Sequence, residues 1–125
     1  MNNEIVTMNL SYSELDGLRS QRNKEGTYIS YLRGKRCKTV DDFFREVSAS
    51  LQFPWYFGNN WPAFDDCVRD LEDWMFFAEI IIIIDDFSLV FPKDTTTRTL
   101  LLKHLKLLIE YWKTNGKKVE VWLNN

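Results

Sequence analysis

Several kinds of catalytic and metal-binding residue are scarce in this 125-residue chain. It contains one histidine, two cysteines and three prolines, and its five glycines are scattered instead of forming a phosphate-binding loop. Neither a zinc-ligand spacing nor a nucleophile motif is present. The single histidine, His104, lies among leucines and lysines, where a histidine is more often a surface or packing residue than a catalytic base. The sequence therefore predicts that the protein is not an enzyme and has no cofactor or metal.

Apolar runs long enough to cross a membrane are also missing. The isoleucine run from Ile80 to Ile84 has only the length of a strand, far short of the roughly 20 apolar residues that span a bilayer. The segment from Met1 to Leu10 lacks the basic start and apolar stretch of a secretory signal. Cys37 and Cys67 have no metal or redox spacing and are expected to be reduced thiols, although the sequence leaves open whether they ever pair. These features predict a cytoplasmic protein with no membrane contact.

The length of the chain fits one domain, and the first 26 residues are expected to form an N-terminal extension to a domain over residues 27–125. Within the extension, the pattern predicts a short strand over Glu4–Leu10 and a brief helix over Tyr12–Ser20. The helix is predicted because Ser11 and Glu14 have the spacing of a capping box.

Hydrophobic periodicity divides residues 27–125 into alternating strands and helices. Strands are predicted over Tyr28–Leu32, Phe77–Ile84 and Val119–Leu123, and helices over Val40–Leu51, Trp61–Asp73 and Thr96–Thr114. The isoleucine run suits a strand that is covered on both faces, as in a parallel sheet under helices. The predicted fold class is α/β, with a small three-stranded parallel sheet packed with about four helices and an N-terminal extension.

Acidic side chains are concentrated in one part of the chain, although the formal net charge is only −2. Between residues 59 and 86 the only base is Arg69, and the acids are Asp65, Asp66, Asp70, Glu72, Asp73, Glu79, Asp85 and Asp86. On the predicted second helix, Asp66, Asp70 and Asp73 share one face. Like charges four residues apart, and negative charge near a helix C-terminus, both destabilise a helix. Stability alone therefore does not explain this acidic face, which is either a solvated surface or a binding face for a cationic partner. Direct nucleic-acid binding is not expected, because phosphates would be repelled.

A loop rich in aromatic residues precedes this acidic helix. It holds Trp55, Tyr56, Phe57 and Trp61 together with Gly58, Asn59 and Asn60. Exposing so many rings is unfavourable, and aromatic side chains beside charge are typical of binding hot spots. The alternative is that some of these rings complete the core.

Two further acids, Asp85 and Asp86, follow the isoleucine run at the end of the strand where α/β proteins often place functional groups. The simpler interpretation is that charged residues end an apolar strand. The alternative, a metal-dependent hydrolase, would use these two acids together with Asp66 and His104.

The stretch from Phe53 to Val68 reads FPWYFGNNWPAFDDCV. It resembles the signature of the barstar family of ribonuclease inhibitors, Leu-Pro-x-Tyr-aromatic-Gly-x-Asn-x-Asp-Ala-Leu-x-Asp-Cys-Leu. The residues that match in register are Pro54, Tyr56, Phe57, Gly58, Asn60, Ala63, Asp66 and Cys67. The resemblance covers about residues 27–125.

This resemblance implies a cytoplasmic immunity protein that occludes the active site of a basic bacterial ribonuclease or nuclease toxin. It implies that the chain is a monomer when free and forms a 1:1 complex. Asp66 would take the place of an RNA phosphate, and Tyr56 would stack at the rim. Together with the acidic face, the expected partner-binding residues are Tyr56, Gly58, Asn59, Asn60, Trp61, Asp65, Asp66, Asp70, Asp73, Glu110 and Tyr111.

Two departures from the family pattern concern the target. Pro62 stands where the family has its first helical acid, and Tyr111 stands where it has an acid on the last helix, with Glu110 one residue away. These departures favour a nuclease other than barnase and leave its identity open. A housekeeping barstar-like module with a non-toxin partner is the alternative.

Overall fold

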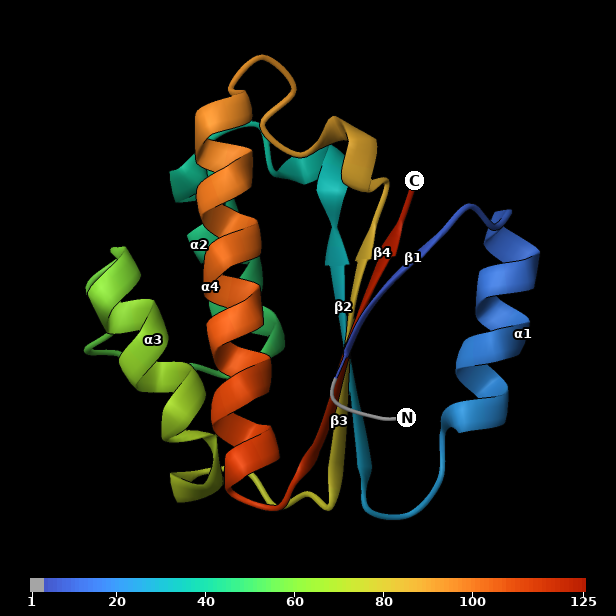
Figure 1. The fold of residues 1–125 in the computed structure, drawn as a ribbon, viewed down its shortest axis with the longest axis vertical. Helices are drawn as coiled ribbons and strands as arrows, with labels where there is room; N and C mark the ends of the chain where they lie inside the picture. Colours follow the sequence, from blue (N-terminus) through green and yellow to red (C-terminus); the bar gives the residue numbers. More distant parts are fainter. Residues whose placement is uncertain (1–3) are drawn as a thin grey trace.

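The computed structural model describes residues 4–125, which form four strands and four α-helices (Figure 1). The strands are β1 (Glu4–Met8), β2 (Thr27–Arg33), β3 (Glu79–Asp85) and β4 (Lys118–Asn124). The helices are α1 (Tyr12–Arg22), α2 (Val40–Ser50), α3 (Trp61–Arg69) and α4 (Thr95–Thr114). Three short 3₁₀ turns are η1 (Gly34–Arg36), η2 (Leu71–Asp73) and η3 (Phe87–Leu89). The α/β class predicted from the sequence is thus confirmed.

The sheet is parallel as predicted, but the predicted number of three strands is wrong. The structure has a four-stranded sheet in the order β1-β4-β3-β2, and all three pairings are parallel. The additional strand is β1, which pairs with β4 from Glu4 opposite Glu120 to Met8 opposite Asn124. The local pattern indicates a strand at this place, but it does not reveal a pairing partner more than 100 residues away along the chain.

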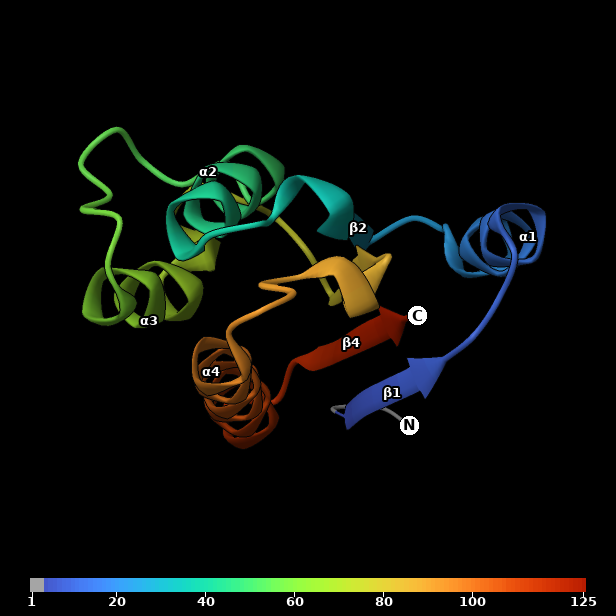
Figure 2. The same cartoon turned by 90° about the horizontal axis from the view of Figure 1, so that it is seen from above.

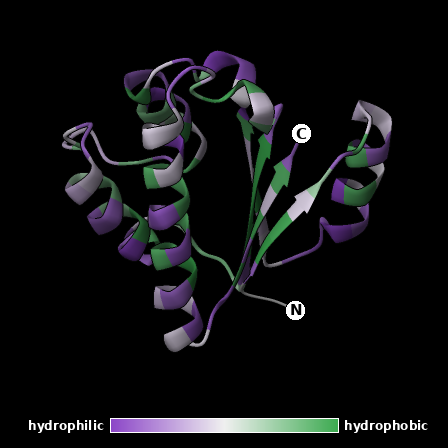
Figure 3. Ribbon diagram, turned by 45° about the horizontal axis from the view of Figure 1, so that its top comes forward, coloured by the Kyte–Doolittle hydropathy of each residue, from purple (hydrophilic) through white to green (hydrophobic). Residues whose placement is uncertain are grey.

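Helices cover both faces of the sheet, with α2, α3 and α4 on one side and α1 alone on the other (Figures 1 and 2). The isoleucines of β3 pack into the cores on both faces of the sheet. Ile80, Ile82 and Ile84 belong to the large core under α2 and α4, whereas Ile81 and Ile83 pack with Leu15 of α1. The prediction of a strand covered on both faces is therefore confirmed. Figure 3 shows the apolar colouring concentrated in the strands at the centre of the molecule.

Side-chain caps set where the helices begin. Ser11 and Glu14 form the predicted capping box at α1, and Thr39 and Asp42 form a second one at α2. Asp94 caps α4 by accepting a hydrogen bond from the backbone of Thr97. These caps satisfy backbone N–H groups that have no partner inside the helix.

The predicted end of the second helix is wrong. Helix α3 stops at Arg69 and Asp70 is its C-cap, so Asp73 lies in the separate η2 turn instead of on a common helical face. Negative charge is unfavourable at a helix C-terminus, where the helix dipole is negative. The acids of this segment therefore favour an early end to the helix.

Both cysteines are free and buried. Burial raises the pKa of the Cys37 thiol to about 12, so this thiol stays protonated at neutral pH. Burial also raises the pKa of Cys67.

No helix in the part of the chain that the structure describes is long and apolar enough to span a membrane.

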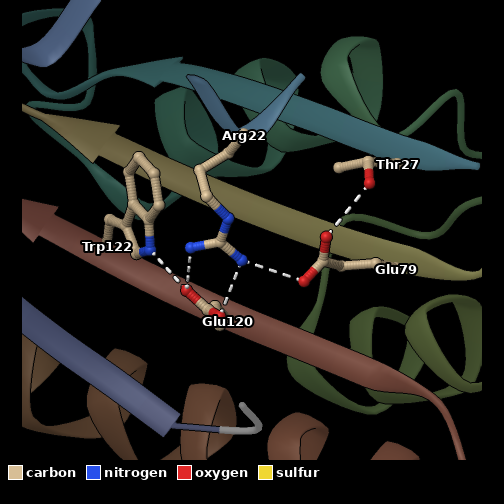
Figure 4. A network of polar contacts seen from close by, with 5 residues as sticks. All are labelled: Arg22, Thr27, Glu79, Glu120 and Trp122. Atoms are coloured by element: carbon tan, nitrogen blue, oxygen red, sulfur yellow. Dashed lines mark hydrogen bonds and ion pairs between the residues drawn. The ribbon is translucent and has the colours of Figure 1, made fainter. Parts of the chain in front are cut away.

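A charged network fastens α1 to the sheet (Figure 4). The Nη2 atom of Arg22 donates to Glu79 and Glu120, each at 2.9 Å, and Nη1 donates to Glu120 at 3.2 Å. The indole of Trp122 donates to Glu120, and the hydroxyl of Thr27 donates to Glu79. Burial alone would raise the pKa of Glu120, but the hydrogen bonds from Arg22 and Trp122 lower it overall. One guanidinium thus bridges two carboxylates on neighbouring strands.

We expect Arg22→Met to reduce the free energy of unfolding by about 2–3 kcal/mol, because it leaves two largely buried carboxylates without their cation. Chemical denaturation at neutral pH measures this change. Arg19→Met is the matched control, since the Arg19–Asp16 pair on the same helix is about 44% exposed and should matter by less than about 1 kcal/mol. Equal losses in the two variants would contradict the role given to Arg22.

The loss of stability in Arg22→Met should also depend on pH. Because the pKa of Glu120 is lowered in the folded protein, its ionised form contributes stability above the ordinary glutamate pKa of 4.5, and this contribution disappears as pH falls through the lowered value. The difference between Arg22→Met and the wild type should therefore shrink in acid. A constant difference from neutral pH to strongly acidic pH would contradict the electrostatic explanation.

Candidate partner-binding site

The loop that joins α2 to α3 is held in one shape by its asparagines. Asn60 is the N-cap of α3: its Oδ1 accepts the backbone N–H of Ala63 at 2.8 Å, and its Nδ2 donates to the carbonyl of Gly58 at 3.2 Å. Asn59 adopts a left-handed conformation with φ of 53°, which asparagine tolerates better than most residues. Pro62 lies in the first turn of α3, where a missing N–H is harmless. The loop is therefore preorganised.

The aromatic residues of this loop divide between solvent and core. Trp55 is 94% exposed and Tyr56 is 63% exposed, and their rings meet edge to face at 5.9 Å. Phe57 instead packs against the rings of Phe44 and Phe53, at 5.6 and 4.9 Å. The alternative that some of these rings complete the core is thus confirmed for Phe57, whereas a binding role for the exposed Trp55 and Tyr56 stays a prediction. Trp55 is more exposed than the predicted site residue Tyr56.

Trp61 and Asp65, two of the predicted partner-binding residues, face α4. The ring of Trp61 stacks on His104 with 4.4 Å between centroids and 7° between planes. Nδ1 of His104 and Oδ1 of Asp65 are 2.8 Å apart, and their side chains are only 10% and 19% exposed. His104 is thus a buried residue with a specific polar partner. Sequence reasoning missed this pair because the two residues are 39 positions apart.

Apart from Asp65, the acids of α3 and of the turn that follows it are open to solvent. The side chain of Asp66 is 71% exposed and accepts a hydrogen bond from Arg69 at 2.8 Å. Asp70 and Asp73 are also exposed, at the C-cap of α3 and in the η2 turn. The structure therefore presents Asp66 outward on a short helix, with more negative charge at the end of that helix.

Helix α4 lies beside α3 and carries the last two predicted site residues. Glu110 is exposed, whereas Tyr111 is half-buried and packs its ring edge-on against Trp112 at 5.0 Å. The indole of Trp112 in turn donates to the backbone carbonyl of Val68 in α3 at 2.8 Å. The two helices are thus joined by directed contacts.

Asp85 has a structural role at the end of β3. Its carboxylate accepts hydrogen bonds from Tyr31, Asn124 and the backbone of Asp86, which joins three strand ends. Burial opposes its ionisation, but these hydrogen bonds lower the pKa of Asp85 overall. Among residues 4–125, the His, Cys, Asp and Glu side chains form no group of three that could hold a metal ion. Asp85, Asp86, Asp66 and His104 therefore do not come together as the metal-dependent alternative required, and His104 is instead paired with Asp65 on α3.

A comparison with known protein families gives a match to the chain. The family model described as Barstar (barnase inhibitor) matches residues 27–124. The chain belongs to the Barstar family. The resemblance seen in the stretch from Phe53 to Val68 is therefore confirmed. The Barstar match starts at the first residue of β2, so β1 and α1 lie outside it.

Barstar membership places the chain in a family of ribonuclease inhibitors. The family is one of inhibitors and not of enzymes, and its description names a ribonuclease, barnase, as the target. A comparison with curated proteins gives no match to the chain.

Proposed function

We propose that this Barstar-family chain is a cytoplasmic immunity protein that binds a basic bacterial ribonuclease or nuclease toxin. In this proposal, α3 and the loop before it cover the active site of the enzyme in a 1:1 complex. The observation that carries the proposal is the exposure of Asp66 on α3, the helix that follows the loop displaying Trp55 and Tyr56.

Electrostatics supports this choice of partner. A ribonuclease active site is cationic because it must bind the RNA backbone, so an exposed carboxylate can occupy the position of a phosphate. The acids at the end of α3, Asp70 and Asp73, add to the negative potential around Asp66. Complementary charge of this kind accelerates encounter and selects the partner more than it raises affinity.

The loop provides the second part of the proposed surface. Its shape is fixed by Asn60, Gly58 and Asn59, so little conformational entropy remains to be lost on binding. Its two exposed rings, Trp55 and Tyr56, belong to residue types that dominate binding hot spots. On this view Glu110 and Tyr111 of α4 lie at the edge of the contact, and Trp61 and Asp65 support it from within.

The proposal is tested by mixing the purified chain with barnase and other basic secreted ribonucleases, and measuring affinity by calorimetry and residual RNA cleavage. We expect tight binding to at least one enzyme, with association that slows markedly as salt is raised. Asp66→Ala should weaken binding at least about 30-fold, because it leaves cationic groups of the enzyme buried without a partner.

Lys24→Ala is the control for this experiment, since Lys24 is an exposed residue just after α1, on the other side of the sheet from α3 and α4. Its affinity should equal that of the wild type. Equal weakening by the two substitutions, or no inhibition of any basic ribonuclease, would show that the face is wrongly assigned or that the function is a different one.

A further inference from the structure

Two directed hydrogen bonds cross the contact between α3 and α4. His104 bonds to Asp65 at the middle of α3 and stacks on Trp61 at its start, one helical turn before Asp65. Near its end, Trp112 donates to the carbonyl of Val68. His104 and Trp112 are two turns apart on α4, so α3 is fastened to α4 at two separate points.

Helix α3 depends on such contacts for its orientation. It has only nine residues, and an isolated helix of this length is marginal in water. Figure 2 shows it as the outer element of its layer, farther from the sheet than α2 and α4. Its buried residues Phe64, Cys67 and Val68 attract it to the core, but hydrophobic contact is non-directional and leaves the helix some freedom to roll.

The Asp65–His104 pair restricts that freedom. A carboxylate can only accept, so Nδ1 of His104 donates to it, and this bond requires Asp65 to point at α4. Asp65 is mostly removed from water, so a rolled helix would either lose this bond or leave a half-buried carboxylate without a donor. The neighbouring residue, Asp66, then points about 100° away around the helix, into solvent.

We infer that His104 and Asp65 are positioning residues, which fix the roll of α3 and thereby the direction in which Asp66 meets the partner. This inference rests on the proposed function for its consequence, but its structural part concerns the free protein alone. It assigns Asp65 an indirect role in the complex, through His104, and it gives the only histidine of the chain a function in recognition.

The decisive variant is His104→Phe, which keeps a flat ring against Trp61 and removes the Nδ1 donor. Ile81→Val is the matched control, because Ile81 is buried on the opposite, α1-covered face of the sheet and its shortening lowers stability without touching α3. Residual dipolar couplings of backbone amides in the free protein report the orientation of α3 relative to β3. A general loss of stability would not change them.

We expect the α3 couplings to change in His104→Phe and to stay constant in Ile81→Val. Unchanged α3 couplings in His104→Phe would overturn the inference. Against a ribonuclease that the wild type inhibits, His104→Phe should bind about ten-fold more weakly, while Ile81→Val should bind normally. Equal affinity of His104→Phe and wild type would also overturn it.

The two arms separate this inference from the proposed function. If the wild type inhibits no ribonuclease while α3 still reorients in His104→Phe, the proposed function fails and the positioning of α3 stands. If the wild type inhibits a ribonuclease and α3 does not reorient, the proposed function stands and the positioning role fails.

Discussion

A chain that begins at residue 27 should fail to fold cooperatively, even though the family match begins there. Removing residues 1–26 deletes β1 and α1, and with them Leu15, which packs on Ile81, Ile83 and Trp122. Exposing these three sheet residues costs up to about 1.5–3 kcal/mol each, a sum comparable with the whole stability of a small domain. The deletion also removes Arg22 and leaves Glu79 and Glu120 without their cation.

Thermal unfolding followed by circular dichroism, together with the dispersion of amide NMR signals, would measure this effect. The full-length chain carrying Lys24→Ala, an exposed loop substitution within the deleted segment, serves as the control and should unfold like the wild type. A truncated chain with a sharp thermal transition and native dispersion would instead support an independent domain over residues 27–125, with residues 1–26 as a dispensable extension.

Gly34→Ala should be the most damaging single-methyl substitution among the glycines. Gly34 opens the η1 turn directly after β2, and a Cβ there would lie 2.3 Å from the backbone oxygens of both Asp85 and Asp86. Backbone atoms cannot rotate away as side chains can, so the turn and the end of β3 would have to separate. That movement would also disturb the bonds that Asp85 receives from Tyr31 and Asn124. We expect Gly34→Ala to lower the free energy of unfolding by about 3 kcal/mol.

Gly17→Ala provides the opposite expectation with the same chemical change. Gly17 is exposed within α1, and beyond the neighbouring backbone of its own helix no heavy atom lies within 4 Å of an added Cβ, so alanine should stabilise the helix by about 0.5–1 kcal/mol. Denaturant unfolding of both variants measures the difference. A Gly34→Ala protein as stable as the wild type would show that η1 and β3 do not pack as closely as described.

The local geometry of the candidate site could be predicted to a large extent from sequence, because its signals are local, whereas its role in binding stays a prediction. The caps of α1 and α3 depend on residues three positions apart, and the exposed Asp66 lies within a continuous matching stretch. The isoleucine run predicted a doubly covered strand for the same reason, since an unbroken apolar run of five residues places isoleucines on both faces of a strand.

The sequence by itself thus determined the α/β class, the family, the parallel sheet and the acidic segment that begins in α3. Tertiary structure alone decided that β1 joins the sheet beside β4, that Asp65 turns to His104, and that Arg22 bridges two strands. Each of these contacts joins residues from 39 to more than 100 positions apart. Periodicity and capping report interactions within one or two turns of chain, whereas the partner of a distant polar group or edge strand is chosen only when the layers pack together.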